Sequence, residues 1–422
     1  MAVAGDDDFG SLDDSAILQA YEDYEQSQDE EVGGGGSVAT TSSVGKSEDA
    51  SGSAIKMKSG IKKIIIQHEE QGTGSSNNVK TGEQSTLANW IYEENNTIIT
   101  ESVRGVRSKY INTSDLQMQE WCEQQMIYNI GAKMGMIPQL ITDEGAVVPV
   151  KEIQLTTPAM KAGTEVHKKK DLEVNSYVNV AVSTHGDSFA LKLLNTIQHI
   201  KHLVMGASCI REVTIFSMPF DYGFMMMGIV DELRMNEHEE LELVEVKTRS
   251  NRFKPLSKAQ VRTHNLQAMV YKQIIDDLTS GVVDGNVVFE KMRLDPKHVL
   301  DEKVLEHARA LDVAGNTLGD IMTTMLDQFR FLPRVSSMVV EYYPSDKDKA
   351  YKELLSSRRV DFDETWLKKR LETHFGFWRG EREVSGVDIE ELWKCNMCQF
   401  VDACHWRKRK NDECVKKMNQ KK

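Results

Sequence analysis

The stretch GIVDELRMNEHEELELVEVKTR at residues 228–249 decides the fold of this chain. It contains two runs in which apolar and charged residues are mixed in the manner of half-buried β-strands. Side chains alternate along a strand, so Glu245 and Lys247 share one face while Val246 points to the other. Asp231 can meet this pair across a hairpin. The stretch therefore predicts two neighbouring strands that gather carboxylates and a lysine inside apolar surroundings.

These charges suit the chemistry of phosphate esters. Two carboxylates that converge at the end of a sheet form a hard-oxygen site for a divalent cation such as Mg²⁺, or Mn²⁺ in its place. A lysine beside that cation can activate water or stabilise charge that develops on a phosphate. The alternative is a set of ordinary salt bridges on exposed strands, because an Asp followed by Glu-x-Lys is a short pattern.

Helices on either side of the strands favour the catalytic interpretation. In the helix predicted after them, Gln267 and Tyr271 are four residues apart and share a face, where Gln267 interrupts an otherwise apolar stripe. In the helix predicted before them, Gly163 and His167 are followed by lysines, and the histidine could complete a metal site. Taken alone, His167 is more typical of a surface helix. The catalytic interpretation is favoured because these residues occur together and in this order.

Periodicity outside this stretch predicts an α/β domain, a mixed sheet flanked by helices. Helical periodicity is found at residues 114–132, 157–173, 188–206, 257–278, 301–329 and 363–375. Short β-branched or alternating runs predict strands at residues 211–218, 223–235, 241–248 and 336–343. The folded body is expected at residues 84–410, and residues 280–335 are expected to be a helical insertion before the last strand.

The two ends differ in composition from this body. Residues 1–80 are expected to be a disordered acidic leader, because they are rich in Gly, Ser and acids and poor in core-forming runs. Residues 1–54 hold thirteen Asp/Glu and one Lys, a net charge of −12, so the remaining 368 residues carry only −1 of the total of −13. The overall acidity therefore does not exclude a polyanionic ligand. Residues 405–422 hold eight Lys/Arg against two acids and are expected to be a basic tail.

Several classes of protein are excluded by what the sequence lacks. No apolar run approaches the roughly 18 residues of a membrane span, and the acidic start resembles neither a secretory signal nor a transit peptide. A soluble intracellular protein that does not enter membranes is expected. Gly45-Lys46-Ser47 has Thr40 where a phosphate-binding loop needs Gly, and no strand precedes it, which excludes a nucleotide-hydrolysing motor.

The cysteines indicate a metal centre. Cys395, Cys398 and Cys404 form a C-x₂-C-x₅-C pattern, and three thiolates within ten residues need a fourth ligand. Cys122, which lies 272 residues upstream of Cys395, is the best candidate, because Cys209 belongs to the predicted core and Cys414 to the tail. A zinc site is the alternative, but Cys₄ zinc usually occurs as two local knuckles. One distant cysteine favours an iron–sulfur cluster that joins the two ends of the body.

The order of the charged residues resembles the RecB-like branch of the PD-(D/E)XK nucleases over about residues 157–343. In that branch a Gly-x-x-x-His helix, an Asp, an Asp/Glu-x-Lys strand and a Gln-x-x-x-Tyr helix follow one another. The resemblance implies metal ligation by His167, Asp231 and Glu245, catalysis by Lys247, and positioning of a substrate phosphate by Gln267 and Tyr271.

Together with the cysteine pattern, the chain resembles more specifically the exonuclease V (defects-in-morphology) family of eukaryotes over about residues 84–410. This resemblance implies a monomeric, Mg²⁺-dependent exonuclease that degrades single-stranded DNA and holds a four-iron four-sulfur (4Fe–4S) cluster. A role in DNA repair is expected, in the nucleus or the mitochondrion. The run Arg407-Lys408-Arg409-Lys410 would serve equally as a nuclear import signal or as a contact to DNA.

Two other functions stay open: a non-catalytic iron–sulfur scaffold that binds single-stranded DNA, and a structure-specific endonuclease of the same fold. A passage for an unpaired strand could form between the insertion and the iron–sulfur region. Candidate contacts to the DNA backbone are the basic residues just past the catalytic strand, Arg249, Arg252, Lys254 and Lys258. Phe375, Phe377 and Trp378 could stack on bases, although aromatic residues at a helix end more often belong to the core.

The leader contains a possible partner-binding segment. A short helix there would place four residues on one apolar face, namely Ile17, Leu18, Tyr21 and Tyr24. The expected partner is a single-strand-binding protein with a basic groove, and the alternative is a tail that only keeps the protein soluble.

Overall fold

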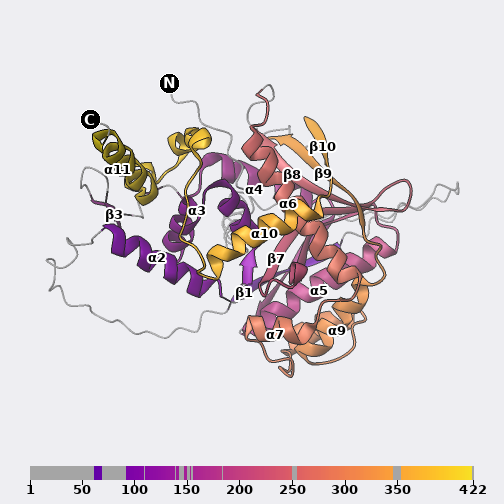
Figure 1. Ribbon diagram of the computed structural model, residues 1–422. Helices are drawn as coiled ribbons and strands as arrows, with labels where there is room; N and C mark the ends of the chain where they lie inside the picture. The colour runs from indigo at the N-terminus through magenta and orange to yellow at the C-terminus, as the bar shows by residue number, and fades with distance from the viewer. Residues whose placement is uncertain are drawn as a thin grey trace, which may run out of the picture.

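The computed structural model describes residues 61–68, 92–108, 110–137, 139–141, 147–149, 153, 155–182, 184–249, 254–345 and 353–420. Its centre is a mixed sheet with helices packed against it (Figure 1). The strands of this sheet are β2 (Tyr110–Asn112), β6 (Cys209–Ser217), β7 (Met225–Met235), β8 (Leu241–Arg249), β9 (Val335–Pro344) and β10 (Ser356–Val360). The predicted α/β fold is therefore confirmed.

The sheet is mixed because its neighbouring strands run in both directions. β8 and β9 are parallel, as are β2 and β7, whereas β7 pairs antiparallel with β6 and β8, and β9 with β10. Val246 on β8 packs with Val166 and Tyr343 in a small cluster that covers one face. Alternation along β8 places Glu245 and Lys247 on the opposite face, as the sequence predicts.

One edge of β7 changes partner along its length, and this change creates the space for the site. β2 pairs with Met225–Met227 and β8 pairs with Glu232–Met235, so residues 228–231 lie between the two pairings. Gly228 is required here, because an added Cβ would lie 2.5 Å from the Tyr271 ring and 2.7 Å from the Thr113 hydroxyl. Two helices thus approach the sheet at its interruption, next to Asp231.

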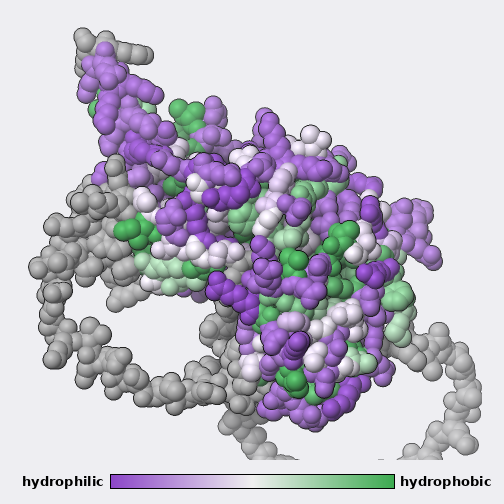
Figure 2. All heavy atoms as spheres, turned by 60° about the horizontal axis from the view of Figure 1, so that its bottom comes forward, coloured by the Kyte–Doolittle hydropathy of each residue, from purple (hydrophilic) through white to green (hydrophobic). Residues whose placement is uncertain are grey.

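The helices follow the predicted order, with differences at several places. The main helices are α2 (Tyr92–Val106), α3 (Thr113–Lys133), α4 (Pro158–Asp171), α5 (His185–Val204), α6 (Lys258–Thr279), α7 (Gly285–Met292), α8 (Glu302–Ala310), α9 (Leu318–Phe329), α10 (Glu364–Trp378) and α11 (His405–Gln420). The helix expected at 301–329 is two helices, because Gly315 has a φ of +106° and Thr317 caps α9 in a capping box with Asp320. The expected basic tail is helical, and α11 projects from the body as a hydrophilic arm (Figures 1 and 2).

The segment at 280–335, which the sequence analysis treats as an insertion, contains α7, α8 and α9. The buried residues of α9 are apolar, and the helix packs against α5. In Figure 1 this group lies at the opposite side of the molecule from α11 and the C-terminus. A passage for an unpaired strand, formed by the insertion together with the cysteine region, stays a prediction.

Smaller elements complete the described chain. They are the strands β1 (Ile61–His68), β3 (Gln139–Ile141), β4 (Val147–Pro149) and β5 (Asn175–Val182), and the 3₁₀ helices η3 (Pro219–Asp221), η5 (Ile389–Met397) and η6 (Val401–Ala403). None of the described helices has the length and apolar character that a membrane crossing requires.

β1 differs from the disordered leader expected at residues 1–80. It pairs in parallel with β5, from Ile61 opposite Asn175 to His68 opposite Val182. The local sequence IKKIIIQH explains the difference, because a run of isoleucines favours an extended backbone. The proposed leader helix with Ile17 and Tyr21 lies outside the described residues.

Glu120 joins the three helices α3, α6 and α10. Its fully buried carboxylate on α3 accepts hydrogen bonds at 2.5 Å from Arg262 of α6 and Arg370 of α10, and lies 2.8 Å from the imidazole of His374. Burial alone would raise the pKa of Glu120. The hydrogen bonds and charges of His374 and Arg370 outweigh burial and lower the pKa to about 2 from an ordinary value of 4.5.

Glu120→Gln should destabilise the protein in a pH-dependent manner. Because the folded pKa of Glu120 is lowered, its ionisation stabilises the fold above about pH 4.5, and this contribution is lost as the pH falls towards 2. The shift corresponds to about 3 kcal/mol at neutral pH. Urea unfolding of both proteins across this range should show a difference in free energy of unfolding that shrinks with acidification. A difference that is independent of pH would contradict this account.

Candidate active site and cysteine centre

The structure brings the predicted charged residues together at the interruption in the sheet. His167 Nδ1 on α4 lies 3.4 Å from Asp231 Oδ1 on β7. The second oxygen of Asp231 accepts a hydrogen bond of 2.6 Å from the backbone N–H of Val246 on β8, which fixes the carboxylate across the two strands. Lys247 Nζ lies 2.9 Å from Glu245 Oε1, and both side chains are almost fully buried.

Glu212 also belongs to this group, although no sequence pattern pointed to it. Its Oε1 lies 3.9 Å from His167 Nδ1, and ligand atoms of Glu212, His167 and Asp231 all lie within 4.8 Å of one another. Within β6, Glu212 has a φ of +53°, a left-handed conformation that is costly for a residue with a Cβ. The pairing of Arg211 with Glu232 and of Val213 with Val230 places Glu212 opposite Asp231.

The electrostatics of the group fit a divalent cation. Burial, together with the nearby negative charge of Asp231, raises the pKa of Glu245 to about 8. Glu245 Oε2 is buried without a hydrogen-bond partner in the described structure. The charges of Lys247 and His167 offset the burial of Glu245 and its repulsion by Asp231 only in part, and a bound cation would add the positive charge that is missing. The donors close enough to share one Mg²⁺ or Mn²⁺ are an imidazole nitrogen of His167 and oxygens of Asp231 and Glu212. Glu245, which was also expected to be a ligand, pairs with Lys247 and is not part of this close group.

Gln267 and Tyr271 lie on one face of α6 as predicted, but they contact α3. Both side chains are buried. Gln267 donates a hydrogen bond of 3.2 Å to the Tyr271 hydroxyl and accepts one from Gln117, and Thr113 donates one of 3.1 Å to the same hydroxyl. Their bonds hold the first half of α3 against the sheet beside Asp231. Gln267 and Tyr271 would therefore influence a substrate phosphate indirectly, because they position α3.

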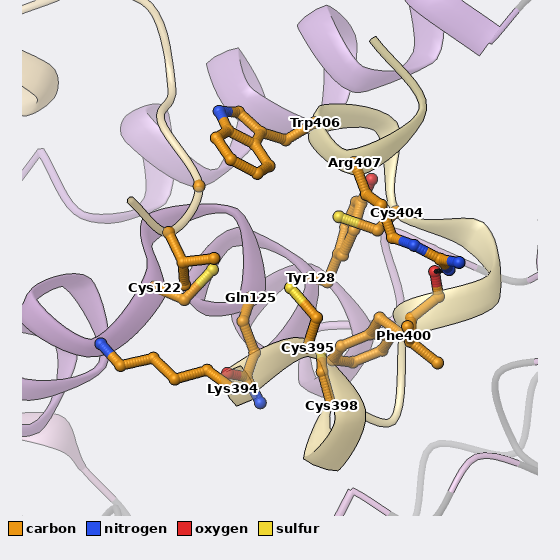
Figure 3. Close-up of a pocket in the computed structure, with 13 residues that line it drawn as sticks. Cys122, Gln125, Tyr128, Lys394, Cys395, Cys398, Phe400, Cys404, Trp406 and Arg407 are labelled. Atoms are coloured by element: carbon orange, nitrogen blue, oxygen red, sulfur yellow. Dashed lines mark hydrogen bonds between the residues drawn. The ribbon is translucent and has the colours of Figure 1, made fainter. Parts of the chain in front are cut away.

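The four cysteines named from the sequence line one pocket (Figure 3). Cys122 comes from α3, Cys395 from η5, and Cys398 and Cys404 from the turns that follow it. α3 is interrupted at Cys122, which has φ −164° and ψ 110°, so the side chain reaches the pocket from an extended residue inside a helix. Cys209 at the start of β6 and the exposed Cys414 on α11 are not among the lining residues.

The thiols of this pocket fit a metal centre. Burial and the neighbouring sulfurs raise the pKa of both Cys122 and Cys398 to about 12. Four such sulfurs can become thiolates only when a cation compensates their charge. Gly386 lets the indole of Trp406 cover the pocket, because an added Cβ would lie 2.3 Å from the ring. The donor set suits an iron–sulfur cluster or zinc.

Comparisons with known proteins identify the family. A family model described as "Exonuclease V - a 5' deoxyribonuclease" matches residues 100–243, 234–330 and 312–407. The chain is 31% identical to Exonuclease V of Danio rerio over 304 residues. This alignment covers 72% of this chain and 71% of that protein. The chain belongs to the exonuclease V family. It is also 35% identical over 65 residues, 15% of this chain and 10% of that protein, to "Exonuclease V, mitochondrial" of Candida albicans strain SC5314.

Membership in the exonuclease V family makes the protein a DNA exonuclease. The candidate DNA contacts of this exonuclease V lie near the end of β8. The Arg249 guanidinium donates to the backbone oxygen of Lys254, and Lys254 and Lys258 are exposed. Arg252 lies outside the described residues. Phe375, Phe377 and Trp378, for which base stacking was the less favoured possibility, belong to the core as expected, and the Trp378 indole donates to Gln119.

The structure adds Arg358 of β10 to the basic residues of this exonuclease V. Burial, with the charges of Lys247, Arg358 and Arg249, lowers the pKa of His264 well below 6.5. His264 Nδ1 lies 3.0 Å from the Tyr342 hydroxyl. Two guanidinium nitrogens of Arg358 are buried without a hydrogen-bond partner in the described structure. Sequence analysis missed Arg358 because β10 is short and its pairing with β9 could not be anticipated.

Proposed function

We propose that this exonuclease V is a metal-dependent nuclease that hydrolyses single-stranded DNA from an end and acts in DNA repair. The observation that carries the proposal is the convergence of Asp231, Glu245 and Lys247 at the interruption in the sheet, with His167 and Glu212 beside them. Family membership supplies the class of reaction, and the arrangement of charges supports hydrolysis of a phosphodiester bond.

In this proposal Mg²⁺ or Mn²⁺, held by His167, Glu212 and Asp231, would polarise the phosphate and stabilise the leaving oxygen. Lys247 orients the attacking water or donates to a phosphate oxygen, and its pairing with Glu245 fixes the direction of its ammonium group. The bond from Val246 N–H to Asp231 holds that carboxylate in place without a rearrangement during the reaction. Arg358 and Arg249 supply positive charge for the strand on the same side of the sheet.

The cysteine pocket is proposed to hold a 4Fe–4S cluster. Its ligands come from both ends of the folded body, which favours a cluster that fastens the chain over a zinc module that folds a local segment. The absorbance spectrum of anaerobically purified protein separates the two metals, because an iron–sulfur cluster absorbs visible light and Zn²⁺ does not. A colourless protein with one equivalent of zinc would exclude the cluster.

A comparison of linear and circular substrates tests the function. The protein should degrade linear single-stranded DNA in the presence of Mg²⁺, and should leave both a circular single strand and blunt duplex intact. Opening of the circle would indicate an endonuclease, and binding of both forms without cleavage would indicate a scaffold. The same assay performed with EDTA should show no degradation if a divalent cation is required.

Location and partners are also part of the proposal. The name of the Candida relative supports action in the mitochondrion. The basic run Arg407–Lys410 lies on the hydrophilic helix α11, where it would serve for nuclear import or for contact with DNA. Action as a monomer, and binding of a single-strand-binding protein through the acidic leader, stay predictions.

A further inference from the structure

α3 bends into an elbow at Cys122, where the backbone is extended. Asn129 Nδ2 lies 3.9 Å from the sulfur of Met118, although eleven residues of straight helix would separate them by about 16 Å. The positive charge of Lys133 likewise reaches Asp115, which is eighteen residues earlier. The two halves of α3 therefore face each other across the extended residue Cys122.

A pocket of about 190 Å³ lies inside this elbow. The pocket has room for about six water molecules. The start of α4 and the segment that carries the C-terminal cysteines close its remaining sides. The lining residues outside α3 include Arg107, Leu155, Thr157, Met160, Met397 and Gln399. The elbow pocket thus lies between the helix that carries His167 and the loop that carries the cysteine centre.

The charges at the elbow pocket suit a phosphate group. Arg107 and Lys133 face one acid, Asp115, whose carboxylate lies 2.7 Å from Arg107 Nε. Lys133 is exposed and makes no ion pair with any residue that the structure describes. The N-termini of α3 and α4 both open on the pocket, at Asn112 and Thr157, and each helix adds partial positive charge. The side chain of Asn112 makes no capping bond.

The remainder of the elbow pocket suits a nucleobase. Its apolar lining includes Trp121 and four flexible, polarisable methionines, at positions 118, 134, 160 and 397. Three amides, Gln125, Asn129 and Gln399, provide donors and acceptors for the edge of a base. They bond to one another at 3.0 and 3.2 Å, so they can exchange these bonds for bonds to a ligand.

The elbow pocket is close to the candidate metal site. Met160 and His167 are seven residues apart on α4, hence on the same face and about 10 Å apart along the axis. On its other side, α3 contacts Tyr271 and Gln267 of α6 through Thr113 and Gln117. A strand whose phosphate lies at Asp231 therefore has a neighbouring nucleotide within reach of the pocket.

We propose that the elbow pocket binds an unpaired nucleotide of the substrate strand next to the scissile phosphate. Its phosphate contacts Lys133, Arg107 and the two helix N-termini, and its base packs against the methionines. A base that is stacked and paired in duplex cannot enter, so the pocket contributes to single-strand selectivity. The inference deepens the proposed function and rests on it. It also links the cysteine centre to DNA binding, because the elbow is formed at Cys122.

Binding measurements with Lys133→Gln test the proposal. We would use Asp231→Asn protein to prevent cleavage and a fluorescent oligothymidylate as the probe. Lys133→Gln should weaken binding and lower the slope of log affinity against log salt by about 0.7, the value for one phosphate contact to a single strand. Lys133→Arg should restore both. The matched control is Lys161→Gln, an exposed α4 position that does not line the pocket and should change neither quantity.

A second measurement addresses the base. Abasic sites placed one at a time along the oligonucleotide should reveal one position at which loss of the base weakens binding about tenfold. Iron content should be the same in all variants. An unchanged salt slope in Lys133→Gln, or equal effects of abasic sites at all positions, would overturn the proposal. Because these are binding measurements, they decide on the pocket even if wild-type protein fails to cleave and the proposed function is wrong.

Discussion

Asp231→Asn should abolish cleavage of linear single-stranded DNA, with a loss of at least about 10³-fold in rate at saturating Mg²⁺. The substitution keeps an oxygen that can accept the hydrogen bond from Val246, so the strands should stay in place while the charge is lost. Lys247→Met should have a similar effect. DNA binding should be largely retained in both variants, because contacts elsewhere along the strand supply most of the affinity.

Glu242→Gln is the matched control for these two variants. Glu242 lies on the same strand, β8, but bonds to Arg234 at 2.6 Å and takes no part in the proposed metal site. The Glu242→Gln variant should cleave at close to the wild-type rate. Single-turnover cleavage of an end-labelled strand, measured beside equilibrium binding, separates loss of chemistry from loss of substrate. Wild-type cleavage by Asp231→Asn would remove that carboxylate from the mechanism.

Glu212→Gln should reduce cleavage less than Asp231→Asn does, and its Mg²⁺ dependence should show whether Glu212 binds the metal. If Glu212 is a ligand, the Mg²⁺ concentration for half-maximal activity should rise by about tenfold or more, and excess Mg²⁺ should restore much of the rate. If Glu212 only neighbours the site, the Mg²⁺ dependence should be unchanged. Its left-handed backbone on a regular strand favours the first result, because such strain persists where the surroundings enforce it.

The sequence could predict the convergence of Asp231, Glu245 and Lys247 because it depends on local rules. Alternation along a strand and the antiparallel pairing of β7 with β8 were sufficient. Glu212 could not be predicted, because its place opposite Asp231 depends on the register of β6 and on one residue with a positive φ. Similarly, the shared face of Gln267 and Tyr271 follows from helical spacing, whereas their partners come from a helix 150 residues earlier.

Helix positions were predictable, whereas of the interruptions at Cys122 and between α8 and α9 only the second had a local sign in the sequence. The periodicity of α3 continues through Cys122, so the pattern gave no sign of the bend, which depends on contacts with the C-terminal segment such as the bond from Gln124 N–H to the Ser385 oxygen. The split between α8 and α9 carried a local sign in Gly315 and the capping residue Thr317. Tertiary contacts decided the first interruption, and local backbone preferences decided the second.

Serine at any of the four cysteines of the pocket should cost iron, stability and DNA binding together. The unfolded chain has no preformed site, so the free energy of cluster binding contributes directly to folding. A cluster bound by Cys122 and the three C-terminal cysteines would hold α3 against η5 and η6, where Lys394 Nζ already donates a bond of 2.9 Å to the Trp121 oxygen. The midpoint temperature of unfolding and the iron content should both fall in each variant, although none of these cysteines belongs to the carboxylate site.

The two remaining cysteines provide the control for this experiment. Cys209→Ser, in β6, and Cys414→Ser, on the exposed face of α11, should keep full iron and wild-type thermal stability. Asp231→Asn should also keep its iron while it loses cleavage, which separates the two centres. Full iron occupancy in Cys122→Ser would mean that the fourth ligand comes from elsewhere. The bend of α3 would then need another cause, and the proposed link between the cluster and the elbow pocket would be lost with it.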